Sequence, residues 1–593
     1  MDKDNARNTI VFTVCAVALL LLYQVFVMGP IAKKRELEAQ QHAAAVAAAP
    51  VAMAEPGSSI FVSREQALGQ SARIKIDTPA LQGSVALKGG RLDDLYLKQY
   101  RETLAKNSPP VELFRPEGAK NAYFSDSGWT GPIAAPGPTT VWSAPTDATL
   151  SPGHPVVLTY DNGQGLVFTR TLSVDERYMF TVVNSVTNRG QKPVQLAAYA
   201  SIQRQGTPNL TPNWLVNEGA VGSLGGVLKQ IAFKAWKKNG DQGADTTGGY
   251  MGITDKYWLA AVAPDQKETV KGEFKVLTVN GADVYEADYV GAPRTLAPGQ
   301  QTSETTHVFA GAKQVSILQD YEKALGIPHF DDAVDWGWLW FFTRPMFWVL
   351  ELFFHLFGNF GLAILGLTVV VKALMFPLAN KSYESMSKMK KLQPQIEAIK
   401  KRFPDDPAKQ QQETMAFYKQ ERVNPLAGCI TMLPTIPVFY SLYTVLTVTI
   451  EMRQAPFFGW IHDLSAGDPT TFVNLFGLIP WNPATTPLIG GILDGPLHLG
   501  VWPLLYGFAM WLNTAMTPQQ SADPTQKMMM QIMPVMFVFI MGRYASGLLI
   551  YWTWSTLLGV AQQYFIMHRY KAENPIDGLI DRLRGRASAP AKT

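Results

Sequence analysis

Long apolar runs divide this chain into two kinds of sequence. The first run, residues 10–28, carries no charge and has the length needed to cross about 30 Å of hydrocarbon. Five more runs lie near the C-terminus, at 360–378, 426–450, 500–516, 528–541 and 546–567. The pattern predicts a polytopic α-helical membrane protein with six spans, of which five form a core over 359–567.

Between the first and second runs, apolar and polar positions alternate with a period of two. Short alternating stretches occur at 73–76, 156–160, 166–172 and 179–186, and they are separated by turns such as Asp161-Asn162-Gly163. This spacing is typical of an all-β sandwich. We therefore expect an anchor at 1–30, an Ala/Pro-rich tether at 31–70 and a β-sandwich domain at 71–325.

The charges between the spans predict the orientation of the chain. Segment 381–425 carries ten Lys/Arg against six Asp/Glu, whereas 451–499 carries one Arg against four acids. Positive residues collect on the cytoplasmic side of membranes. Both termini, the segment 381–425 and the basic tail 568–593 are thus expected in the cytoplasm, and the β-sandwich outside it.

Two segments next to the spans have their own patterns. The stretch 326–358 is rich in Trp and Phe around a few charges, which predicts an amphipathic helix lying in the outer membrane interface. Segment 381–425 has apolar residues three and four apart on either side of a Pro-Asp-Asp-Pro turn at 404–407. This pattern indicates a cytoplasmic helical hairpin, whose Met-bearing stripe either packs the two helices together or binds a ribosome or a nascent chain.

Composition excludes several classes of function. Only 17% of the 593 residues are charged, the net charge is +4, and there are two cysteines. A disulfide scaffold and sequence-specific nucleic-acid binding are therefore not expected. No paired carboxylates, His/Cys cluster, phosphate-binding loop or dinucleotide-binding turn is present, so we expect no enzyme, metal or cofactor.

Lys372 is the single charged side chain within the six expected spans. It lies twelve residues after Phe360 and nine before Lys381, and a lysine side chain is too short to reach bulk water from that depth. No span offers a carboxylate partner. A water-filled groove with polar walls is therefore expected around Lys372, with Thr368, Thr435 and Gln562 among the candidate lining residues.

The C-terminal third resembles the YidC/Oxa1/Alb3 family of membrane protein insertases, in the form found in Gram-negative bacteria. The resemblance is carried by a series of motifs: GNFG (358–361), KALMFPL (372–378), SMSKM (385–389), LQP (392–394), NPLAGC (424–429), EMRQAPF (451–457), WIHDLS (460–465) and SGL (546–548). Lys372 occupies a position that usually carries arginine, so the charge is kept while the guanidinium fork is lost.

The resemblance implies a five-span insertase core, a β-supersandwich outside the bacterial inner membrane, and a hydrophilic groove open to the cytoplasm. It adds Tyr551 and Trp552 to the groove. It also implies a greasy slide for apolar substrate segments, formed by Ile436, Pro437, Phe439, Val535, Met536 and Ile540. The implied partners are newly made membrane proteins, the Sec translocon, a ribosome and the phospholipid bilayer.

Two other functions remain open at this level. A secondary transporter or channel could use the Lys372 site, although paired halves with matching broken helices are not evident. A membrane-anchored sugar-binding enzyme could use Trp129, Trp142, Trp214, Trp236 and Trp258 of the β-domain, although aromatic residues are more often part of a β core.

Overall fold

The computed structural model describes residues 61–570 and 575–577, apart from short gaps. The gaps are 209, 211–215, 280–281, 405, 422, 424–431, 480, 482, 484–485, 487–488, 494–497, 518–523 and 543. The chain divides into two compact units, and residues 60–520 and 534–593 form the larger one, which is described below. The expected anchor (1–30), residues 31–60 of the expected tether (31–70) and most of the basic tail lie outside the described residues. The last part of the expected tether contains α3 (Arg64–Leu68).

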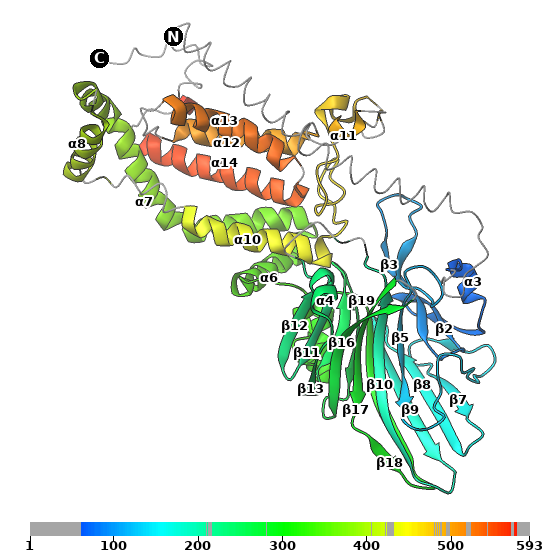
Figure 1. The fold of residues 1–593 in the computed structure, drawn as a ribbon. Coiled ribbons are helices and arrows are strands. Elements are labelled where there is room, and N and C mark those ends of the chain that lie inside the picture. The colour runs from blue at the N-terminus through cyan, green and yellow to red at the C-terminus, as the bar shows by residue number, and fades with distance from the viewer. Residues whose placement is uncertain are drawn as a thin grey trace. The chain divides into compact units, whose positions relative to one another are not determined.

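Residues 73–312 form a β-domain that includes the short helix α4 (Phe233–Asn239) (Figure 1). Its strands are β1 (Arg73–Asp77), β2 (Leu81–Ala86), β3 (Leu92–Arg101), β4 (Pro110–Phe114), β5 (Tyr123–Thr130), β6 (Thr149–Leu150), β7 (Val156–Asp161), β8 (Leu166–Val174), β9 (Met179–Asn188), β10 (Val194–Gln205), β11 (Gly219–Leu224), β12 (Val227–Ala232), β13 (Gln242–Thr247), β14 (Tyr250–Thr254), β15 (Trp258–Pro264), β16 (Thr269–Val279), β17 (Ala282–Gly291), β18 (Arg294–Leu296) and β19 (Gln301–Ala312).

These strands make two sheets, which confirms the predicted sandwich. The 11-stranded sheet runs β13-β16-β17-β10-β5-β3-β2-β1-β6, with β18 also paired to β10 and β4 to β3. The 8-stranded sheet runs β12-β11-β14-β15-β19-β9-β8-β7. All these pairs are antiparallel except β1 with β6.

Alternation along the strands explains how the sandwich forms. In β8 every second side chain is buried and the intervening ones are partly exposed, as the sequence pattern predicts. The buried faces of both sheets share one core. Trp129, Trp142 and Trp236 belong to this core and are at most 3% exposed, so they do not line a surface cleft.

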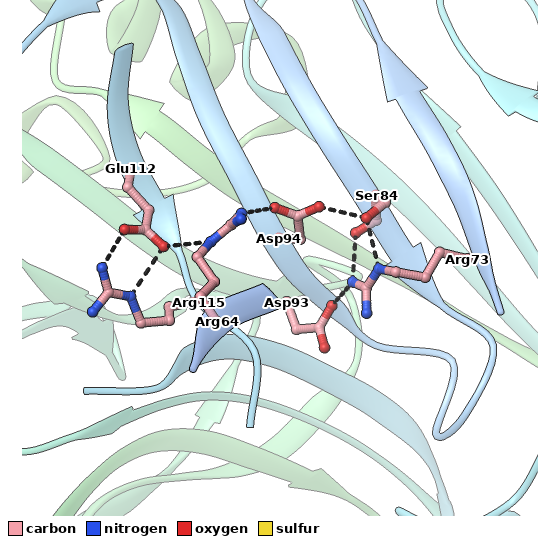
Figure 2. A network of polar contacts seen from close by, with 7 residues as sticks. All are labelled: Arg64, Arg73, Ser84, Asp93, Asp94, Glu112 and Arg115. Atoms are coloured by element: carbon pink, nitrogen blue, oxygen red, sulfur yellow. Dashed lines mark hydrogen bonds and ion pairs between the residues drawn. The ribbon is translucent and has the colours of Figure 1, made fainter. Parts of the chain in front are cut away.

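A polar network fixes the start of the β-domain (Figure 2). Helix α3 (Arg64–Leu68) begins with a capping box at Ser63, and Arg64 pairs with Asp94 and Glu112. Arg115 also donates to Glu112, while Ser84 links Asp94 to Arg73 and Arg73 pairs with Asp93. The chain therefore enters the sandwich at a fixed point.

Helices make up most of the remaining described chain, and all of them lie in the larger unit except residues 524–533 of α13. They are α4 (Phe233–Asn239) and α5 (Val315–Leu325) in and after the β-domain, then α6 (Trp340–Phe357), α7 (Phe360–Arg402), α8 (Pro407–Gln420), α10 (Met432–Val448), α11 (Gly490–Leu493), α12 (Val501–Met516), α13 (Pro524–Met541) and α14 (Ser546–Arg569). The turns η2 (Asp331–Ala333), η3 (Ile450–Met452) and η4 (Phe472–Gly477) lie between them. Helix α14 packs on α7 and α12, and α6 packs on α7 and α10 (Figure 1).

Local sequence explains where α6 and α7 meet. Gly358 ends α6 in the left-handed conformation at φ 65°, which glycine adopts without strain. Asn359 then caps α7 by accepting a hydrogen bond from the Leu362 amide at 3.1 Å. The break that the Gly-Asn pair predicts is therefore present. The expected interfacial segment 326–358 contains η2 and irregular chain before α6 begins at Trp340.

Helix α7 differs from the expected division into a span and a separate hairpin arm. It continues for 43 residues from Phe360 to Arg402, so the hairpin's first arm is the end of the same helix. Among the described residues, Phe360–Ile399 is the one helix that passes as a membrane span by length and composition, and shorter apolar helices cover Pro434–Val448 and Gln531–Met541.

Candidate functional site

The Lys372 ammonium lies between α7 and α14. A Cβ placed on Gly559 of α14 would be 3.5 Å from Lys372 Nζ and 3.4 Å from the hydroxyl of Tyr383, which lies further along α7. Lys372 is partly exposed, and it forms no hydrogen bond or ion pair with another residue that the structure describes. The missing side chain of Gly559 thus leaves room beside an unneutralised cation.

Polar side chains continue from this point along the two helices. Gln562 of α14 donates to Asn380 Oδ1 of α7 at 2.8 Å. Gln562 was a candidate from the sequence, but Asn380, Tyr383 and Gly559 were not. For Asn380 and Tyr383 the signal was spacing, since residues eight and eleven after Lys372 return to the same side of a helix.

The other candidate groove residues occupy different environments. Thr368 is fully buried, and its hydroxyl donates to the Ile364 carbonyl at 2.7 Å, one turn earlier in α7. Thr435 is exposed on α10. Tyr551 is only 3% exposed on α14. The three side chains therefore differ in how far they are exposed.

Trp552 belongs to an aromatic cluster instead. Its ring stacks on Phe439 of α10 at 5.1 Å and on Tyr506 of α12 at 5.7 Å between ring centroids. Trp552 precedes Gly559 by seven residues, which corresponds to about 10 Å along a helix. The cluster joins three helices at a level different from that of Lys372.

The expected slide residues are mostly exposed apolar side chains. Ile436 on α10 is 63% exposed, and Val535, Met536 and Ile540 on α13 are 58%, 45% and 47% exposed. Pro437 and Phe439 are partly buried. The neighbouring Phe539, which was not singled out, is equally exposed at 47%. Both helices therefore present apolar surfaces suited to lipid or to an apolar segment.

A second polar site connects the loop after α10 to the β-domain. Glu451 Oε1 accepts a hydrogen bond from the amide of Val315 at 3.1 Å, while Oε2 is buried without a partner among the described residues. Burial raises the pKa of Glu451 to about 7. Arg453 donates to the Arg101 carbonyl at 2.6 Å and lies over the ring of Trp258. The sequence offered these residues only as part of a motif.

Apolar helices, one of which carries Lys372, are joined to a large β-sandwich. This combination defines a class: integral membrane proteins with one large domain outside the membrane. Two family models match this arrangement. One, described as "YidC periplasmic domain", matches residues 73–349, and the other, described as "60Kd inner membrane protein", matches 352–573.

Relatives match over the whole length. A membrane protein insertase YidC of Caulobacter sp. strain K31 is 54% identical over 99% of both chains, and that of Beijerinckia indica is 45% identical over 99% of this chain and 100% of the other. A solved structure described as an active YidC insertase is 20% identical, with a TM-score of 0.36 over 83% of this chain and 92% of that one. The chain belongs to the YidC family of membrane protein insertases, which are inner-membrane proteins with a periplasmic domain.

Proposed function

We propose that this chain inserts proteins into the inner membrane through a groove centred on Lys372. The observation that carries the proposal is the position of the ammonium, beside Gly559 and the Tyr383 hydroxyl and without an ionic partner among the described residues. A cation in that position attracts acidic residues of an incoming chain. The Gln562–Asn380 pair extends the polar surface along the same helices.

The apolar part of the substrate takes a different path in this proposal. Exposed Ile436 on α10 and exposed Val535, Met536 and Ile540 on α13 form the slide. A transmembrane segment moving along them exchanges one apolar surface for another and then enters lipid. Its transfer out of water supplies the driving force, so no cofactor is needed.

The orientation in this proposal places both termini and the hairpin in the cytoplasm, with six spans in all. The hairpin's Met386 and Met389 are buried with Ile396, Tyr418 and Val423, so the stripe packs the two arms together. Contact with a ribosome would then use the exposed basic residues Lys388, Lys391 and Lys409. Insertion proceeds either alone or beside the Sec translocon.

The test compares Lys372→Arg and Lys372→Ala in cells depleted of the native protein. The substrates are two small membrane proteins that differ only in an acidic or a neutral translocated tail. Lys372→Arg should retain insertion, because charge and depth are kept. Lys372→Ala should reduce insertion of the acidic tail by about tenfold, the effect of losing roughly 1.4 kcal/mol of attraction, and affect the neutral tail less.

Lys381→Ala is the matched control, because Lys381 is an exposed lysine further along the same helix. It should insert both substrates normally. Equal losses for acidic and neutral tails in Lys372→Ala would contradict the electrostatic role. Repeating the assay in liposomes that contain only this protein separates insertion alone from insertion with the Sec translocon.

A further inference from the structure

A cavity of about 590 Å³ lies where the β-domain passes into α6. This size is within the range of small-molecule sites. Its lining is unusual in charge, with four carboxylates, one guanidinium, one imidazole and two indoles. These residues are Glu322, Asp331, Asp332, Asp335, Arg344, His329, Trp336 and Trp340. None of them belongs to the groove around Lys372.

Two of the four carboxylates are already paired. Asp331 and Asp332 both accept from the Arg344 guanidinium, and Asp332 also lies 2.8 Å from His329 Nδ1. Gln319 completes the environment of Asp331 by donating to its second oxygen at 3.2 Å. Arg344 therefore neutralises part of the negative charge and leaves the rest of the cavity acidic.

The other two carboxylates accept hydrogen bonds from backbone amides, and burial together with the neighbouring Asp331 carboxyl raises the pKa of Glu322. Glu322 accepts from the Asp331 amide at 3.0 Å. Asp335 accepts from the amides of Asn217 and Gly337, both at 3.1 Å. Neither forms an ion pair within the described part of the chain, although the buried Lys313 interacts electrostatically with Asp335. Both retain free acceptor positions, which suits a cation with hydrogen-bond donors.

The arrangement does not suit a bare metal ion. Among the described residues, no three His, Cys, Asp or Glu side chains come together in a way that could hold one. A primary ammonium donates up to three hydrogen bonds and needs only two carboxylate acceptors, and Glu322 and Asp335 both line this cavity. The indole rings of Trp336 and Trp340 add faces that attract ammonium groups.

Two residues that line the cavity also carry buried hydrogen-bond donors without acceptors among the described residues. Trp336 is only 4% exposed, and its indole N–H has no partner among the described residues. Arg344 Nε is likewise unpartnered there. Both atoms are buried, so an anionic oxygen reaches them only after a small shift of the side chains. Such an oxygen would satisfy donors that the protein leaves unpaired.

The surroundings of the cavity indicate the source of the ligand. At the start of α6, Trp338, Trp340 and Phe341 are 70%, 57% and 53% exposed. Exposed indole rings of membrane proteins collect at the depth of lipid headgroups. A group with an ammonium at one end and a phosphate at the other is present at that depth in zwitterionic phospholipids.

We propose that this cavity binds the headgroup of a phospholipid with a primary ammonium, of the phosphatidylethanolamine type. Glu322 and Asp335 hold the ammonium, Arg344 and the Trp336 indole N–H hold the phosphate, and Trp340 covers the mouth. The bound lipid ties the end of the β-domain to the membrane surface. The inference does not depend on the groove at Lys372.

The test measures lipid binding to the purified full-length protein in maltoside micelles by native mass spectrometry and calorimetry. The probes are dihexanoyl phosphatidylethanolamine, phosphatidylcholine and phosphatidylglycerol, with free phosphoethanolamine as a soluble comparison. We expect one site that prefers phosphatidylethanolamine to phosphatidylglycerol by about tenfold or more, as charged hydrogen bonds imply. Phosphatidylcholine should bind more weakly, because its trimethylammonium cannot donate hydrogen bonds.

Variants connect the preference to the cavity. Glu322→Gln keeps an oxygen for the Asp331 amide and removes one charge, so it should weaken phosphatidylethanolamine binding by about tenfold. Asp335→Asn removes a charge independently, should Glu322→Gln fail to fold. Trp336→Phe should weaken phosphatidylethanolamine and phosphatidylglycerol alike, because both carry the phosphate. The matched controls are Glu176→Gln, at an exposed carboxylate, and Trp129→Phe, at another buried indole without a partner.

Three outcomes would overturn the proposal. The first is equal binding of phosphatidylethanolamine and phosphatidylglycerol by the unmodified protein. The second is full retention of phosphatidylethanolamine binding in both charge variants. The third is binding of free phosphoethanolamine as tight as that of the lipid, which would make the site one for a soluble amine.

Discussion

Glu451→Gln should remove a pH dependence from the contact between the loop after α10 and the β-domain. In the folded protein the Glu451 carboxyl accepts from the Val315 amide, and burial raises its pKa from 4.5 to about 7, with a smaller contribution from Glu351. The docked state therefore binds the proton more tightly than the open state. The contact is strongest below about pH 4.5 and weakens as the pH rises to about 7.

The pKa change sets the size of the effect. A rise from 4.5 to about 7 corresponds to about 3 kcal/mol over the whole pH window. Between about pH 5.5 and pH 8 the free energy that keeps the contact closed falls by roughly 2 kcal/mol, which raises the opening equilibrium constant about thirtyfold. Glutamine keeps an oxygen for the Val315 amide and carries no titrating proton, so Glu451→Gln should lose almost none of this stability.

Hydrogen exchange at the Val315 amide measures this contact directly. Protection factors, corrected for the intrinsic pH dependence of exchange, give the local opening free energy. In the unmodified full-length protein, protection at Val315 should fall about thirtyfold between about pH 5.5 and pH 8, and in Glu451→Gln it should stay constant. Glu413→Gln, at an exposed carboxylate of α8, is the control. The same pH dependence in Glu451→Gln as in the unmodified protein would refute the assignment.

Three further predictions follow from close packing and ion pairs. Gly361→Ala should lower the stability by about 1–3 kcal/mol, seen as a lower thermal midpoint, because its Cβ would lie 1.9 Å from the Phe457 ring; an unchanged midpoint would contradict this packing. Arg64→Ala should lower the free energy of unfolding by about 1–2 kcal/mol and speed proteolysis near α3, because it removes two partly buried ion pairs. Unchanged stability and proteolysis would show that these pairs contribute nothing. Gly559→Ala should insert proteins normally, since its Cβ meets the Lys372 ammonium at an ordinary 3.5 Å, whereas Gly559→Val should fill that space and reduce insertion.

Local sequence patterns predicted most of the secondary structure of this chain. Period-two alternation predicted strands such as β8, where burial of every second side chain needs only a core on one side. The order of the strands was not predictable, because β10 pairs with β5 and β17, which are distant in sequence. Apolar runs predicted helices, but not that α7 continues past its span, since no cap or glycine interrupts it there.

The candidate site was predictable only in part, because a local pattern identifies single residues but not the distant residues that contact them. Lys372 was identifiable because a charge within an apolar span is costly unless it is solvated or paired. Its neighbour Gly559 lies 187 residues later in the chain and carries no chemical group that signals a role. The hydrogen bond from Val315 to Glu451 likewise joins residues 136 positions apart. Such contacts arise from tertiary packing, which periodicity in one sequence does not encode.

Because α7 is continuous, movement of the hairpin is transmitted to the segment near Lys372. At 1.5 Å per residue, its 43 residues form a rod of about 65 Å, with Lys372 less than a third of the way along. Pro377 lies within the helix five residues after Lys372, and a proline there removes a backbone hydrogen bond and eases bending. Pro394 lies nearer the far end of α7, so a sideways push there bends the helix at either proline. Bending at Pro377 rotates the segment that follows Lys372 and carries Asn380 and Tyr383 with it. Whatever binds the hairpin gains mechanical access to the space beside Gly559 without touching it.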